Sequence, residues 1–67
     1  MFKFCIFERS VGKFVSWINE LPGENLYLGY CDDIRCAASS RKEKLVNCVC
    51  EKLNKLGFDC CVKILVL

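Results

Sequence analysis

Cysteine is the residue type with the most chemical potential in this chain. The 67 residues include seven cysteines and no histidine. A cysteine nucleophile is normally activated by a neighbouring base, and histidine is the side chain that carries protons near neutral pH. The acidic residues are scattered except for the pair Asp32 and Asp33, which is typical of a solvated turn. We therefore expect no enzyme activity, no cofactor and no small-molecule substrate.

The cysteine spacings do not predict a metal site. The closest spacings are Cys31-x4-Cys36, Cys48-x-Cys50 and Cys60-Cys61. Structural zinc sites commonly use two cysteines separated by two residues, a pattern that this chain lacks. Cys5 and Cys61 are the pair that we expect on neighbouring strands of an open sheet face, and they are the candidates for a redox or metal role. The other thiols are expected to act mainly as small core hydrophobes.

The odd number of cysteines argues against a disulfide scaffold. The first ten residues, "MFKFCIFERS", do not read as a cleavable signal sequence. No stretch approaches the roughly 18 apolar residues of a transmembrane helix. We therefore expect a single domain, residues 1–67, in the reducing cytoplasm and without a membrane partner.

Periodicity and turn signals predict six elements. Alternation predicts a strand over Met1–Glu8, and apolar residues at helical spacing predict a helix over Ser10–Leu21. Pro22 and Gly23 then end that helix. The remaining elements are two short strands, Leu26–Tyr30 and Ile34–Ala38, a second helix, Arg41–Leu56, closed by Gly57, and a last strand, Phe58–Leu67.

The order β-α-β-β-α-β predicts an α+β fold of the ferredoxin-like, split β-α-β kind. It would have a four-stranded antiparallel sheet, in the order 4-1-3-2, with both helices on one face. The alternative keeps residues 25–38 as one bent strand and gives a three-stranded β-α-β-α-β sheet.

The segment "ASSRKEKL" places Arg41, Lys42 and Lys44 at the start of the second helix. That end of a helix carries the positive end of its dipole, so cations there are mildly unfavourable. Ser40 and Glu43 match a capping box, which explains the start of the helix but not its cations. Residues 39–56 carry five cations and two acids, a net charge of +3, while the whole chain carries +2. We expect these cations to face an acidic partner.

The sheet face away from the predicted helices is the second candidate surface. It would carry Phe7, Lys63 and Leu65, with Arg35 kept outside by solvation and Tyr30 added if the hairpin turn has two or four residues. Aromatic and arginine groups on an apolar face are typical of interface hot spots. The last strand would also form an edge with Lys63 as its one charged guard, and such edges pair readily.

These features favour a small, non-catalytic protein-binding module that acts through an apolar and basic surface. Its predicted partner-binding residues are Phe7, Tyr30, Arg35, Arg41, Lys42, Lys44, Lys63 and Leu65. Phage-type inhibitors of host proteins, anti-CRISPR proteins among them, are of this size and kind. The partner would be a host protein or a second copy in a homodimer. The alternative is a nucleic-acid or phosphate-binding module that uses the basic N-terminus of the second helix.

Overall fold

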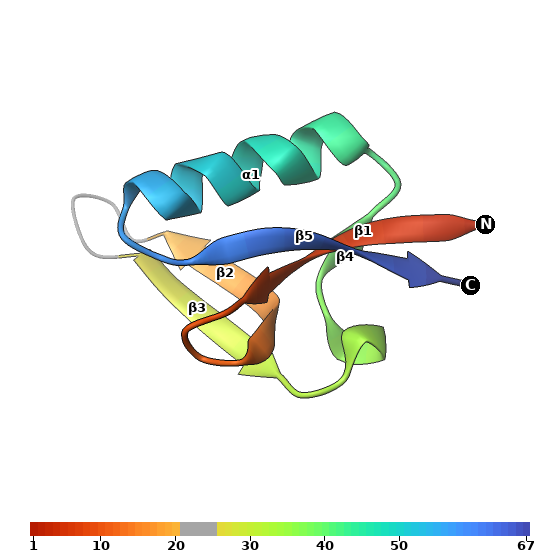
Figure 1. The fold of residues 1–67 in the computed structure, drawn as a ribbon, viewed down its shortest axis with the longest axis horizontal. Coiled ribbons are helices and arrows are strands. Elements are labelled where there is room, and N and C mark those ends of the chain that lie inside the picture. The colour runs from red at the N-terminus through yellow and green to blue at the C-terminus, as the bar shows by residue number, and fades with distance from the viewer. Residues whose placement is uncertain (21–25) are drawn as a thin grey trace.

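The computed structural model describes residues 1–20 and 26–67. In these ranges the elements are β1 (Phe2–Glu8), β2 (Lys13–Glu20), β3 (Leu26–Cys31), the 3-10 turn η1 (Ile34–Cys36), β4 (Ser39–Ser40), α1 (Glu43–Lys55) and β5 (Cys60–Val66). Antiparallel pairing joins the strands into one sheet, and α1 covers one of its faces (Figure 1). We call the covered face the helix side and the opposite face the outer face.

Strand β1 is the centre of the sheet, and the strand predicted for the first eight residues is confirmed. Alternation puts Phe4 and Ile6 on the helix side, where both are buried. Strand β5 pairs with β1 along its whole length and with no other described strand. The last strand is therefore confirmed as well, at the edge of the sheet beside β1.

The helix predicted for Ser10–Leu21 is wrong, because β2 occupies Lys13–Glu20. Residues 9–12 turn the chain back after β1, and Gly12 takes the left-handed conformation with a φ of 75°. The segment "KFVSWINE" is rich in aromatic and β-branched residues, which favour extended backbone. The apolar residues of this segment are also spaced as in a helix, but pairing with β1 and β3 makes it a strand. The predicted helix end at Leu21 and the stop at Pro22 and Gly23 lie outside the described residues.

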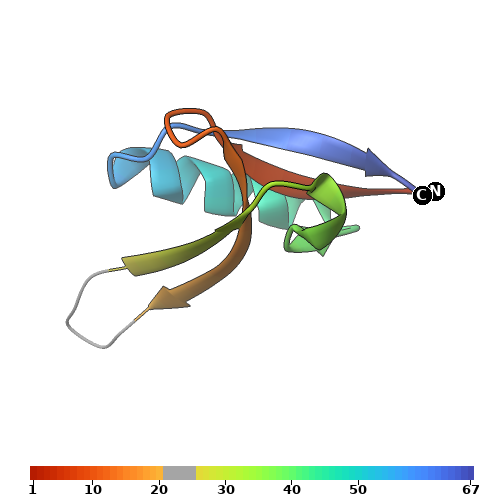
Figure 2. The ribbon, with the colours of Figure 1, turned by 90° about the horizontal axis from the view of Figure 1, so that it is seen from below.

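Strand β2 leaves β1 directly after Phe14, its second paired residue. The pairing of β2 with β3 shifts register between Val15 and Trp17, and a bulge of this kind bends a strand and increases its twist. Strand β4 takes the vacated place beside β1, where the N–H of Ala38 donates to the carbonyl of Val15 at 3.0 Å. Figure 2 shows the β2–β3 hairpin turning away from the helix as a result.

The strand predicted for Ile34–Ala38 is also wrong. Residues Ile34–Cys36 form η1, and Asp33 caps this turn by accepting the N–H of Arg35 at 2.9 Å. An aspartate that bonds to nearby backbone in this way offers the chain an alternative to a strand ladder. Extended structure resumes only at Ser39–Ser40.

Helix α1 begins two residues later than predicted, and the capping box does not form. Lys42 is the N-cap and makes no side-chain cap bond. The hydroxyl of Ser40 instead accepts the backbone N–H of Lys42 at 3.0 Å. The buried stripe of the helix is Val46, Cys50 and Leu53.

The C-terminal cap of α1 at Gly57 is confirmed. Gly57 has a φ of 106°, and its N–H donates to the carbonyl of Asn54 at 3.1 Å. The N–H of Phe58 donates to the carbonyl of Leu53, also at 3.1 Å. These two bonds form a Schellman motif, and both Phe58 and Leu53 pack in the core beside it.

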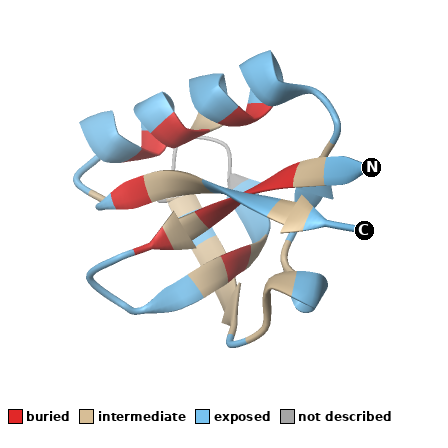
Figure 3. Cartoon of the chain, turned by 45° about the vertical axis from the view of Figure 1, so that its right-hand side comes forward, coloured by how far each residue is buried: buried red, intermediate tan, exposed pale blue. Residues whose placement is uncertain are grey.

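The ferredoxin-like plan with two helices and four strands is wrong, and the three-stranded alternative is wrong as well. Across residues 1–20 and 26–67 the sheet has five strands in the order β3-β2-β1-β4, with β5 on the opposite edge of β1. Buried residues gather between α1 and the strands that it covers (Figure 3). A single helix leaves the helix side of the β2–β3 hairpin incompletely covered, so Leu26, Leu28 and Tyr30 are only partly buried there.

Candidate partner-binding groove

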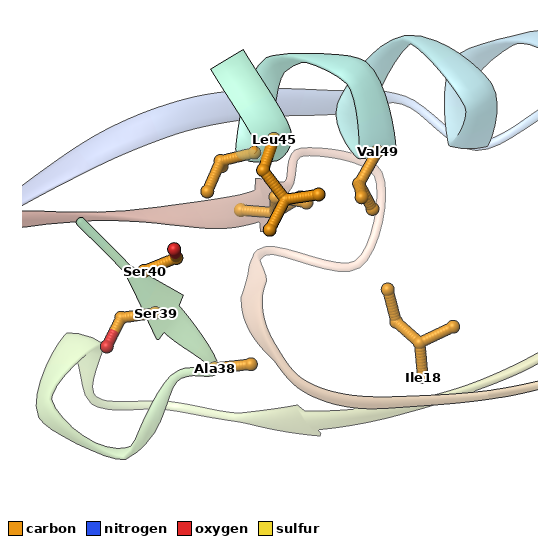
Figure 4. A pocket seen from close by; sticks show the side chains of 8 residues that line it. Ile18, Ala38, Ser39, Ser40, Leu45 and Val49 are labelled. Carbon is orange, nitrogen blue, oxygen red and sulfur yellow. The ribbon is translucent and has the colours of Figure 1, made fainter. Parts of the chain in front are cut away.

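An apolar groove lies between α1 and the β2–β3 hairpin, where the hairpin diverges from the helix. Its first part is a cavity of about 170 Å³. The lining residues are Ile6, Ile18, Ala38, Ser39, Ser40, Leu45, Val46 and Val49. In Figure 4 Ile18 points from β2 toward α1, while Leu45 and Val49 project from the helix into the same space. The cavity is open because β2 and α1 do not pack closely against each other at this end.

A second hollow of about 160 Å³ continues the groove along α1. It shares Ile18 and Val49 with the first part, and Leu26, Lys52 and Leu53 complete its lining. The hydrophobic floor consists of core residues, whereas Ile18 on the rim is half-exposed. The two hollows therefore adjoin at Ile18 and Val49, and we call them together the groove.

The three cations of "ASSRKEKL" lie at the end of the groove formed by the start of α1. Arg41 and Lys42 follow the lining residue Ser40, and Lys44 precedes the lining residue Leu45. All three cations are exposed, and none forms an ion pair with another described residue. The first-turn N–H groups of α1 also lack a side-chain cap. The backbone of these three residues is thus next to the apolar cavity, and the guanidinium of Arg41 lies 3.4 Å from the sulfur of Met1.

Phe7, Lys63 and Leu65 share the outer face of β1 and β5, as the sequence predicted. The ring of Phe7 packs edge-on against Phe14, with centroids 5.0 Å apart, and Lys63 Nζ lies 5.8 Å from the centroid of Phe7. Leu65 lies opposite Lys3 in the ladder. This face is internally packed and half-buried around Phe7, and it lies on the other side of the sheet from the groove.

Tyr30 and Arg35 do not join that outer-face group. Tyr30 lies opposite Val15 on the helix side, and its hydroxyl donates to Oε1 of Glu8 at 3.4 Å. Burial and the nearby Glu8 carboxylate raise the pKa of Tyr30. The guanidinium of Arg35 is bound to Asp33, with an N–O distance of 2.6 Å, which lowers the pKa of Asp33 to about 2. The eight predicted binding residues therefore do not form one surface. Three lie at the start of α1, three on the outer face, and Tyr30 and Arg35 apart from both groups.

The buried thiols are held in the neutral form. Cys5 is wholly buried, and burial raises the pKa of its thiol. Burial likewise raises the pKa of Cys50, and that of Cys60 to about 11. Cys5 lies opposite Lys63 and Cys61 opposite Phe7, so the two candidate thiols are diagonal rather than paired. Across residues 1–20 and 26–67, no group of three or more His, Cys, Asp or Glu side chains could hold a metal.

Sequence reasoning missed the groove because it assigned Ile18 to a helix. Leu45 is next to the buried Val46 on α1, yet it is 53% exposed at the mouth of the cavity. The signal that could have found the groove is the β-rich composition of "KFVSWINE". A strand there removes one of the two helices that would have covered the sheet.

Comparisons with protein families, curated proteins and solved structures found no match to this chain. No helix in the described ranges is long and apolar enough to span a membrane. Any functional conclusion therefore depends on the geometry above.

Proposed function

We propose that this chain is a small protein-binding module whose groove takes an apolar side chain of a partner that carries carboxylates beside it. The observation that supports this proposal is the apolar cavity of about 170 Å³ next to three cations without ion pairs in the described chain. An apolar cavity of about 150 Å³ is large enough for a benzene ring. One aromatic or large aliphatic side chain thus matches the space available.

The charge beside the groove selects among apolar segments. The positive end of the α1 dipole adds to the charge of Arg41, Lys42 and Lys44. Glu43 is the one acid in the first turn of the helix. Carboxylates that flank the inserted apolar residue would be attracted to this end of the groove. Cations in the same positions would be repelled, so the charge contributes to specificity more than to affinity.

Nucleic acid or phosphate binding at the same helix terminus is the second candidate. The uncapped N–H groups of α1 and its three cations favour an anion. One observation favours the protein partner over it. The cavity beside the cations is lined almost entirely by apolar atoms. A nucleic-acid ligand would leave the cavity unused.

A displayed peptide library selected on the purified protein tests the proposal. The selected peptides should share one large apolar residue with Asp or Glu beside it. These peptides should no longer bind the Leu45→Asp variant, because the substitution puts a charge into the groove. They should still bind Leu56→Asp, a matched control at the C-cap of α1 that is 58% exposed and away from the lining.

Charge reversal separates the two candidates. Arg41→Glu with Lys44→Glu should abolish the preference for acidic peptides, while Lys55→Glu at the other end of α1 should leave it intact. Peptides without an apolar–acidic pattern, or peptides that bind Leu45→Asp unchanged, would refute the groove as the binding site. Binding of a single-stranded oligonucleotide that weakens steeply with salt and ignores Leu45→Asp would favour the nucleic-acid alternative.

The cellular location and the biological role of this module stay predictions. A reducing cytoplasm suits a chain whose seven cysteines are all free, three of them in the buried interior. A role as an inhibitor of a host protein, with anti-CRISPR proteins as one class, follows from size and kind alone. The absence of catalytic activity also stays a prediction.

A further inference from the structure

Strand β5 has one edge that no described strand pairs with. Among the described strands its only partner is β1, and the sequence of the strand, "CCVKILV", carries one charged residue, Lys63. Figure 2 shows β5 along the margin of the sheet. An edge of this length with a single charge is a template for strand pairing.

Two hydrogen bonds at the ends of the ladder determine which peptide groups of β5 point outward. Leu67 donates to the carbonyl of Met1 at 2.9 Å and Arg9 donates to that of Asp59 at 2.8 Å, at the two ends of the ladder. Hydrogen-bonded pairs alternate with non-hydrogen-bonded pairs in an antiparallel ladder. The odd-numbered residues of β5 therefore bond to β1, and the even-numbered residues direct their N–H and C=O groups away from it.

One of the outward residues is already capped. The side chain of Asn54 binds both backbone groups of Cys60, with its Oδ1 2.6 Å from the nitrogen and its Nδ2 3.1 Å from the oxygen. No such cap reaches Val62, Ile64 or Val66 from the described part of the chain. Ile64 is 56% exposed and Val66 77% exposed, so the open half of the edge is also apolar.

Only some registers allow two copies of this edge to pair. The uncapped residues must lie opposite one another, with the two-fold axis perpendicular to the sheet and between the two paired strands. An axis through Lys63 would place two lysines opposite each other, which is unfavourable. An axis through Ile64 places Ile64 opposite itself, Val62 opposite Val66, and Lys63 opposite Leu65. That register uses every uncapped outward residue and separates the like charges.

We propose that two copies of this chain associate through antiparallel β5–β5 pairing, with the two-fold axis at Ile64. The pairing would join the two sheets into one continuous sheet. It is independent of the groove, which lies on the helix side between α1 and the β2–β3 hairpin. The proposal therefore goes beyond the proposed function and can fail or hold without it.

Light scattering of the reduced protein over a hundredfold range of concentration tests the pairing. The mass should rise from that of one chain toward twice 7.7 kDa, and added salt should not reverse the rise because the contacts are apolar and backbone bonds. Ile64→Asp should hold the mass at one chain, since two carboxylates would meet at the axis. Leu45→Asp in the groove should dimerise as the wild type does.

Leu65→Glu tests the register. The new carboxylate would lie opposite Lys63 of the second copy, twice per dimer, and should tighten the dimer about threefold to tenfold at low salt. Lys3 lies opposite position 65 within the chain, so the substitution adds no like-charge contact there. An axis through Lys63 would instead put position 65 opposite Cys61, with no gain.

Three results would overturn the proposal. They are a single-chain mass at every concentration, a dimer that Leu45→Asp rather than Ile64→Asp abolishes, and a Leu65→Glu dimer no tighter than the wild type. Circular dichroism establishes that each variant is folded. If Ile64→Asp does not fold, Val66→Lys at the more exposed position replaces it and should likewise prevent dimerisation.

Discussion

Replacing Glu8 with alanine should remove a buried acceptor that ties the β1–β2 turn to β3. Glu8 is 3% exposed and is the one buried charged residue in the described ranges. Its Oε2 accepts the N–H of Ser10 at 3.0 Å, the Ser10 hydroxyl and the N–H of Val11 at 3.4 Å. Its Oε1 accepts the hydroxyl of Tyr30 at 3.4 Å. Hydrogen-bond donors, and not a cation, therefore compensate for the burial of the Glu8 carboxylate.

The loss can be estimated from these contacts. Hydrogen bonds to a charged group contribute roughly 1.5–3 kcal/mol each, but Ser10 and Val11 are exposed and can bond to water after the substitution. Removing the carboxylate also relieves its own desolvation. We expect Glu8→Ala to lower the free energy of unfolding by about 2 kcal/mol, which for a domain of this size is about 10 °C in Tm.

The glutamine variant separates acceptor geometry from charge. In Glu8→Gln the amide oxygen can occupy the Oε2 position, and Tyr30 can turn its hydroxyl to accept from the amide nitrogen. We expect a loss of about 1 kcal/mol or less. Glu51→Ala, an exposed glutamate on α1, is the control and should change little.

Urea unfolding monitored by the fluorescence of Trp17, the single tryptophan, measures all three variants. Equal losses for Glu8→Ala and Glu8→Gln would refute the role of the acceptor. A Glu8→Ala midpoint within error of Glu51→Ala would refute any structural role for the carboxylate.

Two further predictions concern the junction of α1 and β5. Asn54→Ala should cost about 1–3 kcal/mol, because it leaves the buried backbone groups of Cys60 without partners, while Asn47→Ala on the exposed face of α1 should be neutral in the same urea titration. The neutral Cys60 thiol is favoured by folding, with a pKa of about 11 against an ordinary value of 9.0. The contribution of Cys60 to stability should therefore be constant below about pH 8 and fall as the pH rises from 9 toward 11, so Cys60→Ala should show a smaller fall in stability between pH 8 and pH 10.5. Equal slopes for the two proteins would contradict the assignment.

Some elements could be predicted from local signals in the sequence alone. Alternation over the first eight residues identified β1, and the apolar run before the C-terminus identified β5 and its place at an edge. Gly57 marked the end of α1 because a left-handed cap is close to a glycine property. Each of these features depends on residues that are neighbours in the chain.

The segment that became β2 could not be assigned in the same way. Phe14, Val15 and Ile18 fit a helical stripe and a strand about equally well, and the choice depends on pairing with β3, which is distant in the sequence. One wrong element changed the whole fold class, because the missing helix leaves the sheet half covered. The groove, with Ile18 facing α1, follows from that change.

The sequence by itself determined two features of the surface: a basic segment at Arg41–Lys44 and an edge strand with one charge. Only the tertiary structure decided where these features lie relative to one another. The divergence of β2 at Phe14 opens the cavity beside the basic segment, and the ladder between β1 and β5 directs the N–H and C=O groups of Val62, Ile64 and Val66 outward. Both results depend on strand pairing between distant residues, which no local pattern specifies.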